Sequence, residues 1–249
     1  MHGAGAVWLA ASPHSAGTIA SLLAANHAVI AAAGLFPRSS WLGPNLSRLP
    51  ESPATAGVVA LTFDDGPDPE VTPRVLDLLD RAGQKATFFC IGRRAQAHPG
   101  IIAAIRAGGH GVENHSHRHP HTFAFRGPQG LAEEIRAAQA AIAASGGGMP
   151  RFFRAPAGFR NPWLAEVLDE AGLSLVSWTR RGFDVASRDA HRITARLLRG
   201  LAARDILVLH DRVPIALDVL PAVLEALRRH ELTSRPLGAV VPAPAGESD

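Results

Sequence analysis

The chain has 249 residues, of which 47% are hydrophobic and 19% are charged, and its formal net charge is +3. These values suit one large globular domain, or one domain with an appendage, and they exclude an intrinsically disordered chain. The single cysteine excludes a disulfide scaffold, and the small net charge gives no argument for nucleic-acid binding.

The first 37 residues contain no Asp, Glu, Lys or Arg. Residues 17–36 form an uncharged run long enough to cross a bilayer, but seven of them are alanine, and Asn26 and His27 are polar. Three interpretations of residues 1–36 stay open: a membrane segment, a removed signal peptide, or an Ala-rich helix on the surface of the protein or the membrane. Arg38 and Arg48 follow the run, which favours a cytoplasmic remainder by the positive-inside rule. We expect a membrane-associated or cell-envelope protein rather than a soluble cytoplasmic one.

Proline and glycine recur through residues 37–57, which predicts a linker, followed by a main domain at 58–241 and a tail at 242–249. Short apolar runs in the domain predict strands over residues 58–64, 86–91, 110–114, 152–155, 173–178, 206–209 and 237–241. Apolar residues at helical spacing predict intervening helices around residues 72–79, 101–105, 131–142, 164–171, 193–201 and 217–227.

This alternation predicts an α/β fold, a distorted (β/α) barrel of about seven parallel strands with surrounding helices. An open doubly wound sheet is the alternative. No Gly-rich dinucleotide fingerprint follows the first strand, which disfavours a nucleotide-binding sheet of that kind.

Residue types that carry chemistry follow several of the predicted strands. They are Asp64, Asp65, His115, His119, Arg154, Asp184 and His210. All of them fall at carboxyl ends of strands, which is the face where an α/β barrel carries its active site.

The histidines indicate a metal site. His115 and His119 are four residues apart, so a helical turn there would place both rings on one face. With a carboxylate from another strand they would form a site typical of catalytic zinc or of non-haem iron. The nearest candidate acids, Asp64 and Asp65, lie 50 residues upstream, which favours hydrolysis over oxygenase chemistry. Consecutive strand residues point to opposite faces, so these two acids are expected to do different jobs.

Four segments in this order resemble the motifs of the polysaccharide deacetylases, the NodB-homology or chitooligosaccharide deacetylase family (carbohydrate esterase family four). The segments are TFDDGP at 62–67, HSHRH at 115–119, RAPAG at 154–158 and LVLH at 207–210. The resemblance covers about residues 58–241. It identifies that stretch as a polysaccharide deacetylase catalytic domain.

The resemblance implies a role for each motif residue. The first acid, Asp64, would be the general base, and the second, Asp65, would bind the metal. His115 and His119 would complete the metal site. Arg154 would hold and orient the base. These roles agree with the chemistry of amide hydrolysis, which needs an activated water and a carboxylate kept off the metal.

The resemblance assigns the leaving-group side as well. His210 would be the general acid and Asp184 would tune it, because a nearby acid keeps an imidazole charged. The backbone N–H of Ala157 would stabilise the oxyanion. The family often has Tyr or Phe at that position, so the substrate site here loses an aromatic wall.

Other positions depart from the family pattern near the expected substrate site. Trp178 aligns well, but Val185 stands where a second Trp usually follows the acid. Val208 replaces a leucine in the pocket expected to receive the acetyl methyl group. Arg180 and Arg181 occupy a place where an acidic residue is common, and they could read an anionic group on the substrate or could form a solvated loop pair.

We therefore predict a metal-dependent hydrolase that removes N-acyl groups, by default N-acetyl, from an amino-sugar-containing glycan. One divalent cation is expected, zinc in preference to Co, Ni, Fe or Mn. Two alternatives stay open: a deacylase or deformylase of a lipid-linked amino sugar, and a non-catalytic domain that binds a glycan or a partner protein. The sequence predicts no nucleic-acid partner and leaves the oligomeric state open.

Overall fold

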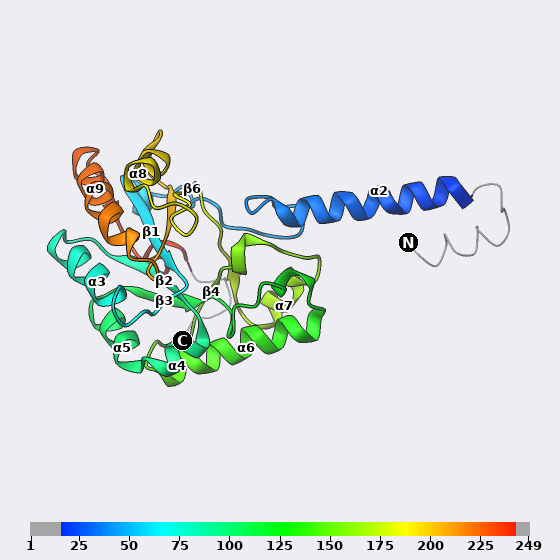
Figure 1. Ribbon diagram of the computed structural model, residues 1–249, viewed down its shortest axis with the longest axis horizontal. Helices are drawn as coiled ribbons and strands as arrows, with labels where there is room; N and C mark the ends of the chain where they lie inside the picture. Colours follow the sequence, from blue (N-terminus) through cyan, green and yellow to red (C-terminus); the bar gives the residue numbers. More distant parts are fainter. Residues whose placement is uncertain (1–15, 243–249) are drawn as a thin grey trace.

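The computed structural model describes residues 16–242 (Figure 1). The first 15 residues of the predicted N-terminal segment, and residues 243–249 of the predicted tail, lie outside the described part. The division of the chain at residues 36, 57 and 241 stays a prediction.

One parallel sheet organises the molecule. Its strands are β1 (Val58–Asp64), β2 (Ala86–Cys90), β3 (Gly111–Asn114), β4 (Phe152–Phe153), β5 (Ser174–Leu175), β6 (Arg180–Arg181), β7 (Ile206–His210) and β8 (Thr233–Ser234). Seven follow the order β5-β4-β3-β2-β1-β7-β6, and β8 pairs with the start of β1. Every strand pairing among residues 16–242 is parallel. The predicted α/β fold of about seven parallel strands is confirmed, as a curled half-barrel whose ends are β5 and β6.

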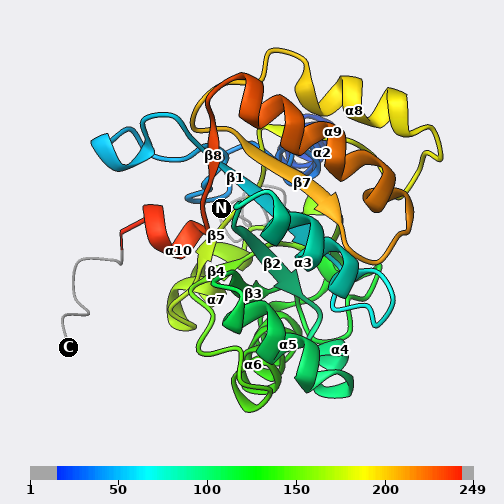
Figure 2. The same ribbon diagram turned by 90° about the vertical axis from the view of Figure 1, so that its left-hand side faces the viewer.

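Helices surround the sheet (Figures 1 and 2). They are α3 (Thr72–Arg81), α4 (Gly92–Ala97), α5 (Pro99–Ala107), α6 (Pro128–Ala144), α7 (Leu164–Glu170), α8 (Ala190–Leu198), α9 (Ile215–Arg229) and α10 (Leu237–Val240), with short 3-10 turns η2 (Pro53–Thr55), η3 (Phe123–Phe125) and η4 (Pro156–Gly158). Helix α9 packs between α3 and α8, and α6 packs on α4 and α7. The helices therefore pack on one another as well as on the sheet.

The central strand β1 separates two apolar regions. Val59, Leu61 and Phe63 belong to the outer core under the helices, whereas Ala60 belongs to the inner core within the curl of the sheet. The inner row of β1 continues through Thr62 to Asp64, because side chains alternate between faces along a strand. The inner row therefore changes from apolar to polar at the carboxyl end, where Asp64 is the register partner of His210 on β7.

The prediction of a last strand at 237–241 is wrong. Residues Leu237–Val240 form the short helix α10, and Leu237 and Val240 are both buried in the inner core. Two apolar residues three apart share one face of a helical turn, and a run this short carries no periodicity that separates helix from strand.

The predicted strand at 173–178 is shortened to β5, and the two-residue strands β6 and β8 were not predicted. Val176, which falls beyond β5, instead forms a bridge with Leu46. Leu49, in the same stretch as Leu46, is fully buried in the inner core. Residues 37–57 therefore supply side chains that close the curled sheet, which a Pro- and Gly-rich composition does not reveal.

Helix α2 (Ala16–Leu35) extends away from the sheet and its covering helices (Figure 1). It is the one helix among the described residues that is long and apolar enough to cross a membrane. Most of its surface is exposed, including Leu22 and Val29. Its last turn is held to the body by the N–H of Arg160, which donates to the carbonyl of Gly34 at 3.1 Å.

Candidate active site

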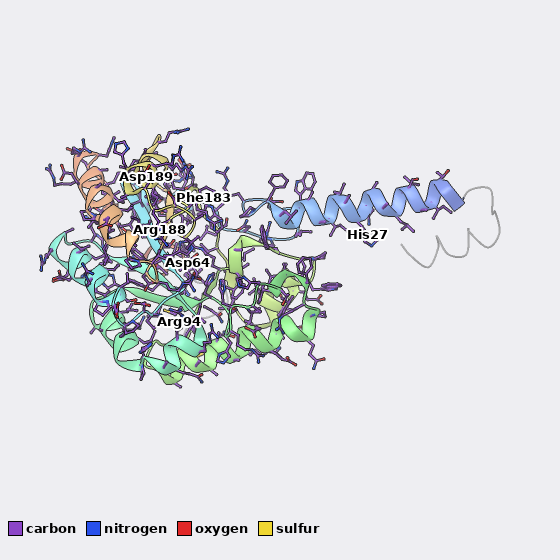
Figure 3. The ribbon with its side chains drawn as sticks, viewed as in Figure 1. His27, Asp64, Arg94, Phe183, Arg188 and Asp189 are labelled. Carbon is purple, nitrogen blue, oxygen red and sulfur yellow. The ribbon has the colours of Figure 1, made fainter. Side chains whose placement is uncertain are left out.

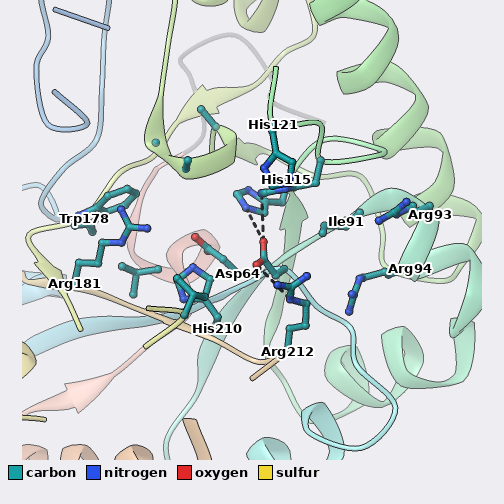
Figure 4. A pocket seen from close by; sticks show the side chains of 17 residues that line it. Asp64, Ile91, Arg93, Arg94, His115, His121, Trp178, Arg181, His210 and Arg212 are labelled. Carbon is teal, nitrogen blue, oxygen red and sulfur yellow. Dashed lines mark ion pairs between the residues drawn. The ribbon is translucent and has the colours of Figure 1, made fainter. Parts of the chain in front are cut away.

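A pocket of about 280 Å³ opens at the carboxyl ends of the strands (Figure 4). The sequence-predicted residues that line it are Asp64, Asp65, His115, His119, Ala157, Trp178, Val208 and His210. Arg154 and Asp184 do not line the pocket. They are buried behind it, where each contacts one of the lining side chains.

Asp65 and the two predicted histidine ligands converge on one point. Their donor atoms all lie within 4.8 Å of one another, and Asp65 Oδ1 is 3.4 Å from His115 Nε2 and 3.3 Å from His119 Nε2. One carboxylate oxygen and two imidazole nitrogens are a donor set typical of catalytic zinc, which keeps a further position open for water or substrate. These residues therefore fit a divalent metal.

Hydrogen bonding prepares His115 for this role. Its Nδ1 lies 2.8 Å from the carbonyl oxygen of Arg154. A carbonyl only accepts, so Nδ1 carries the proton and Nε2 presents a lone pair toward Asp65. Burial, and then the neighbouring His115, lower the pKa of His119 to about 4, so its ring is neutral at physiological pH, as metal binding requires.

The local backbone differs from the expectation at both motifs. His115 and His119 do not share a helical turn, because the loop is irregular and Ser116 and His119 both have positive φ angles. Asp65 also has a positive φ, of 73°, so it leaves the strand geometry directly after β1. Both Asp64 and Asp65 consequently line the same pocket, where continued strand geometry would separate their side chains.

Asp64 is held by a buried arginine. Arg154 Nη1 donates to Asp64 Oδ1 at 2.6 Å and to Thr62 Oγ1 at 2.7 Å. The rest of the guanidinium donates to the carbonyls of Val176 and Ser177. Because this bond fixes one carboxylate oxygen of Asp64, it also fixes the direction in which the other oxygen points.

His210 is paired with a buried acid. Its Nδ1 lies 2.8 Å from Asp184 Oδ1, and its backbone N–H donates to Asp184 Oδ2 at 2.8 Å. Burial alone would lower the pKa of His210, but the bond to Asp184 and the charges of Asp64 and Asp65 outweigh it and raise the pKa. The arrangement favours the protonated imidazole.

The loop that carries the histidines is fixed by Glu134 on α6, which the sequence reasoning missed. Glu134 Oε2 accepts from the backbone N–H groups of His117 and Arg118, and Oε1 accepts from Arg118 Nε at 2.8 Å. Glu134 stands three residues after Leu131 and four before Ala138, on the buried side of α6. The sequence did contain a signal for this role, because Glu134 is a charged residue within the mostly apolar stripe that α6 buries.

Four further basic residues line the pocket that were not predicted to do so. They are Arg93, Arg94, His121 and Arg212, and Arg212 Nε lies 3.7 Å from Asp65 Oδ2. Of the two residues in the predicted Arg pair, Arg180 is bound to Asp205 at 2.7 Å, whereas Arg181 stands over the Trp178 ring at 5.0 Å and lines the pocket. His117 is absent from the pocket lining.

Ala157 lies in η4 with φ of 56°, a left-handed conformation that an alanine adopts at some cost. Gly158 follows, and a side chain there would collide with Trp178 and approach Pro37. This turn therefore packs directly against the pocket wall and against the segment that leaves α2.

Comparison with known proteins agrees with the motifs. The family model for polysaccharide deacetylase matches residues 51–176. A peptidoglycan-N-acetylglucosamine deacetylase of Listeria monocytogenes is 36% identical over 68% of this chain, but the match spans only 36% of that protein. A chitooligosaccharide deacetylase of Bradyrhizobium sp. (strain ANU 289) is 37% identical over 63% of this chain and 71% of its own length.

Solved structures give the same result. A family 4 carbohydrate esterase from Streptomyces lividans, in complex with acetate, is 33% identical, with a TM-score of 0.70 over 77% of this chain and 98% of that one. The fold, the order of the motifs and these similarities lead to one conclusion: the chain belongs to the polysaccharide deacetylase family, carbohydrate esterase family four.

Proposed function

We propose that this protein is a metal-dependent hydrolase that removes N-acetyl groups from an amino-sugar glycan. The observation that carries the proposal is the convergence of Asp65, His115 and His119 beside Asp64 and His210 in one pocket. The names of the relatives, which are deacetylases of peptidoglycan and chitooligosaccharides, support the reaction class.

Asp65, His115 and His119 would hold the metal. A bound divalent cation, zinc in preference to Co, Ni, Fe or Mn, polarises the amide carbonyl and makes water more acidic. Asp64, held through one oxygen by Arg154, uses its other oxygen to accept the proton of the attacking water. Arg154 thereby positions the base without contacting the substrate.

The remaining residues act on the two products. His210, kept protonated by Asp184, donates its proton to the departing amine as the C–N bond breaks. The water oxygen stays on the acyl carbon, so the products are acetate and a free amino sugar. The N–H of Ala157 donates to the oxyanion, and Trp178 and Val208 form the wall that meets the acetyl methyl group.

We further propose that α2 holds the enzyme at a membrane of the cell envelope. Its apolar residues surround the whole helix, and its surface is exposed where it leaves the body. A helix that is apolar on all sides requires an apolar environment. Fractionation of cells expressing the full chain tests this point, because an anchored protein sediments with membranes and resists extraction by high salt.

Mass spectrometry of products tests the activity. The full-length protein, loaded with zinc, is incubated with acetylated polymers, short N-acetylglucosamine oligomers and lipid-linked sugars. The expected product is lighter than the substrate by one or more acetyl groups, and chelation abolishes its formation. Bound metal without turnover of any substrate would favour a non-catalytic glycan- or partner-binding domain.

A further inference from the structure

A second groove adjoins the active-site pocket on the side of α2. It has a volume of about 740 Å³ and shares Ala157, Trp178 and Arg181 with the pocket. Its lining contains no acidic residue and five arginines: Arg38, Arg180, Arg181, Arg196 and Arg199. The groove is therefore a concave, strongly cationic surface that lies directly beside the proposed catalytic site.

Most of this charge is uncompensated. Arg180 is paired with Asp205, which also pairs with Arg48, but the ion pairs found within residues 16–242 include none of the other four arginines. Two of the four are placed by aromatic rings instead, since Arg181 lies 5.0 Å from the Phe183 ring and Arg196 lies 5.7 Å from it. Several guanidinium groups around one concavity attract an anion strongly.

The groove is held in place by contacts that do not involve these charges. Arg160 Nη2 donates to the carbonyl of Ser39 at 2.6 Å, and Asn45 Nδ2 donates to that of Pro37 at 2.8 Å. These bonds fix the segment that carries Arg38. Arg181 belongs to strand β6, which pairs with β7. The cations therefore stand on fixed backbone while their charged ends remain available.

The groove also lies at the end of the apolar helix. Leu35, the last residue of α2, lines it. Phe36 and Trp41, which follow the helix, are 66% and 78% exposed. Figure 3 shows that α2 projects away from the active site, because His27 in the middle of the helix lies far from Asp64. Exposed aromatic residues at the end of an apolar helix are typical of the membrane–water interface, where lipid phosphates lie.

We propose that this groove is a subsite for a phosphate group of the substrate, and that the substrate is an N-acyl amino sugar joined through phosphate to a lipid. The inference rests on the proposed deacylase function and names the substrate class of that same site. The amide enters the pocket, the phosphate binds Arg38, Arg181, Arg196 and Arg199, and the lipid stays in the membrane beside α2.

Two synthetic substrates that differ by one phosphate group test the proposal. The zinc-loaded, full-length protein in nanodiscs of zwitterionic lipid receives decyl N-acetylglucosaminyl phosphate or the neutral decyl N-acetylglucosaminide. We expect kcat/KM to be at least about tenfold higher for the phosphate compound, mostly through KM, since hydrogen bonds to charged groups are worth about this much. Arg196→Gln and Arg38→Gln should each reduce this preference about fivefold or more, and both effects should weaken with added salt.

Arg74→Gln, which removes an exposed arginine of α3 outside the groove, is the matched control and should leave the preference intact. Equal kcat/KM values for the two compounds, or a preference that survives both groove substitutions, would overturn the phosphate subsite. Equal turnover of a soluble N-acetylglucosamine 1-phosphate would refute the lipid part, and so would preference for peptide-bearing glycan fragments.

Binding of the two decyl compounds to the same nanodiscs separates failure of the subsite from failure of the proposed activity. If neither compound is hydrolysed, the deacylase proposal is wrong for these sugars, yet the subsite still predicts about tenfold tighter binding of the phosphate compound. Binding of anionic vesicles that Arg196→Gln weakens, without discrimination between the two sugars, would show a membrane contact in place of a substrate site.

Discussion

The active-site pocket and the arginine groove lie side by side but treat charge in opposite ways. Behind the pocket, Arg154 is fully buried and each of its nitrogens has an acceptor, and the pocket residue His210 is joined to the buried Asp184 by two hydrogen bonds. In the groove, Arg38 and Arg196 are exposed and belong to no ion pair within the described chain.

This difference corresponds to two different functions, proton transfer in the pocket and anion recognition in the groove. Proton transfer needs groups held within a few tenths of an ångström, so it favours charges whose partners are supplied by the protein. Recognition of an incoming anion needs charges whose partner is supplied by the ligand. The same residue type therefore stabilises the fold at Arg154 and is available for binding at Arg196.

The largest expected effect is on the base. Asp64→Asn keeps the size and the bond to Arg154 but removes the proton acceptor, so kcat should fall by about 10²–10⁴-fold. Steady-state assay of acetate release measures it. Asp77→Asn, on the exposed face of α3, is the control and should retain the wild-type rate.

The free energy of unfolding of Arg154→Met tests the contrast between the buried arginine behind the pocket and the exposed arginines of the groove. It leaves the Asp64 carboxylate buried without its cation, which should lower the free energy of unfolding by about 3–5 kcal/mol. Arg196→Gln in the groove should change it by less than about 1 kcal/mol, because this side chain is exposed. Denaturant titration gives both values, and similar losses for the two variants would break the comparison.

Glu134→Ala should weaken zinc binding by about 10–100-fold, although Glu134 contacts no proposed ligand side chain. It removes the acceptor for two backbone N–H groups in the loop between His115 and His119. Competition with a zinc chelator measures the affinity. Glu134→Gln retains an acceptor and should recover part of the loss, whereas unchanged affinity in both variants would contradict the positioning role.

The pH dependence tests the pairing of His210 with Asp184. A general acid must be protonated, so activity is lost as pH rises through the raised pKa of His210. Asp184→Asn removes the main contact that raises this pKa, and the alkaline limb of kcat/KM should move to lower pH. The free energy of unfolding should follow pH in the same direction. The stability contributed by protonated His210 is fully present below the pKa of His210 in the unfolded chain, and it is lost as pH rises through the raised pKa of His210 in the folded protein. An unmoved limb would refute the assignment.

Sequence patterns predicted the site residues that lie at the ends of strands, but they did not predict the residues that other elements bring to the site. Asp64 and His210 terminate buried apolar runs, so the parallel alternation alone put them on one edge of the sheet. Glu134 acts from the second turn of α6, and Arg212 follows the motif histidine by two residues. Glu134 is far from any strand end, so tertiary packing alone brings it to the site, whereas Arg212 lies in the turn directly after β7.

The sequence also did not allow backbone conformations with positive φ to be predicted. Asp65 joins Asp64 in one pocket because its backbone turns left-handed directly after β1, whereas strand periodicity would separate them. The cationic groove was visible only as the pair Arg180 and Arg181. Arg38 precedes these by more than 140 residues, and the sequence contains no periodic signal that joins them.

Metal content and deacetylation, measured on the same preparations of wild-type protein and Asp64→Asn, test the central claim most directly. The account predicts one zinc ion in each, rapid acetate release by the wild type that chelation abolishes, and almost none by the variant. A variant that deacetylates at the wild-type rate, or a wild-type enzyme equally active without metal, would contradict it.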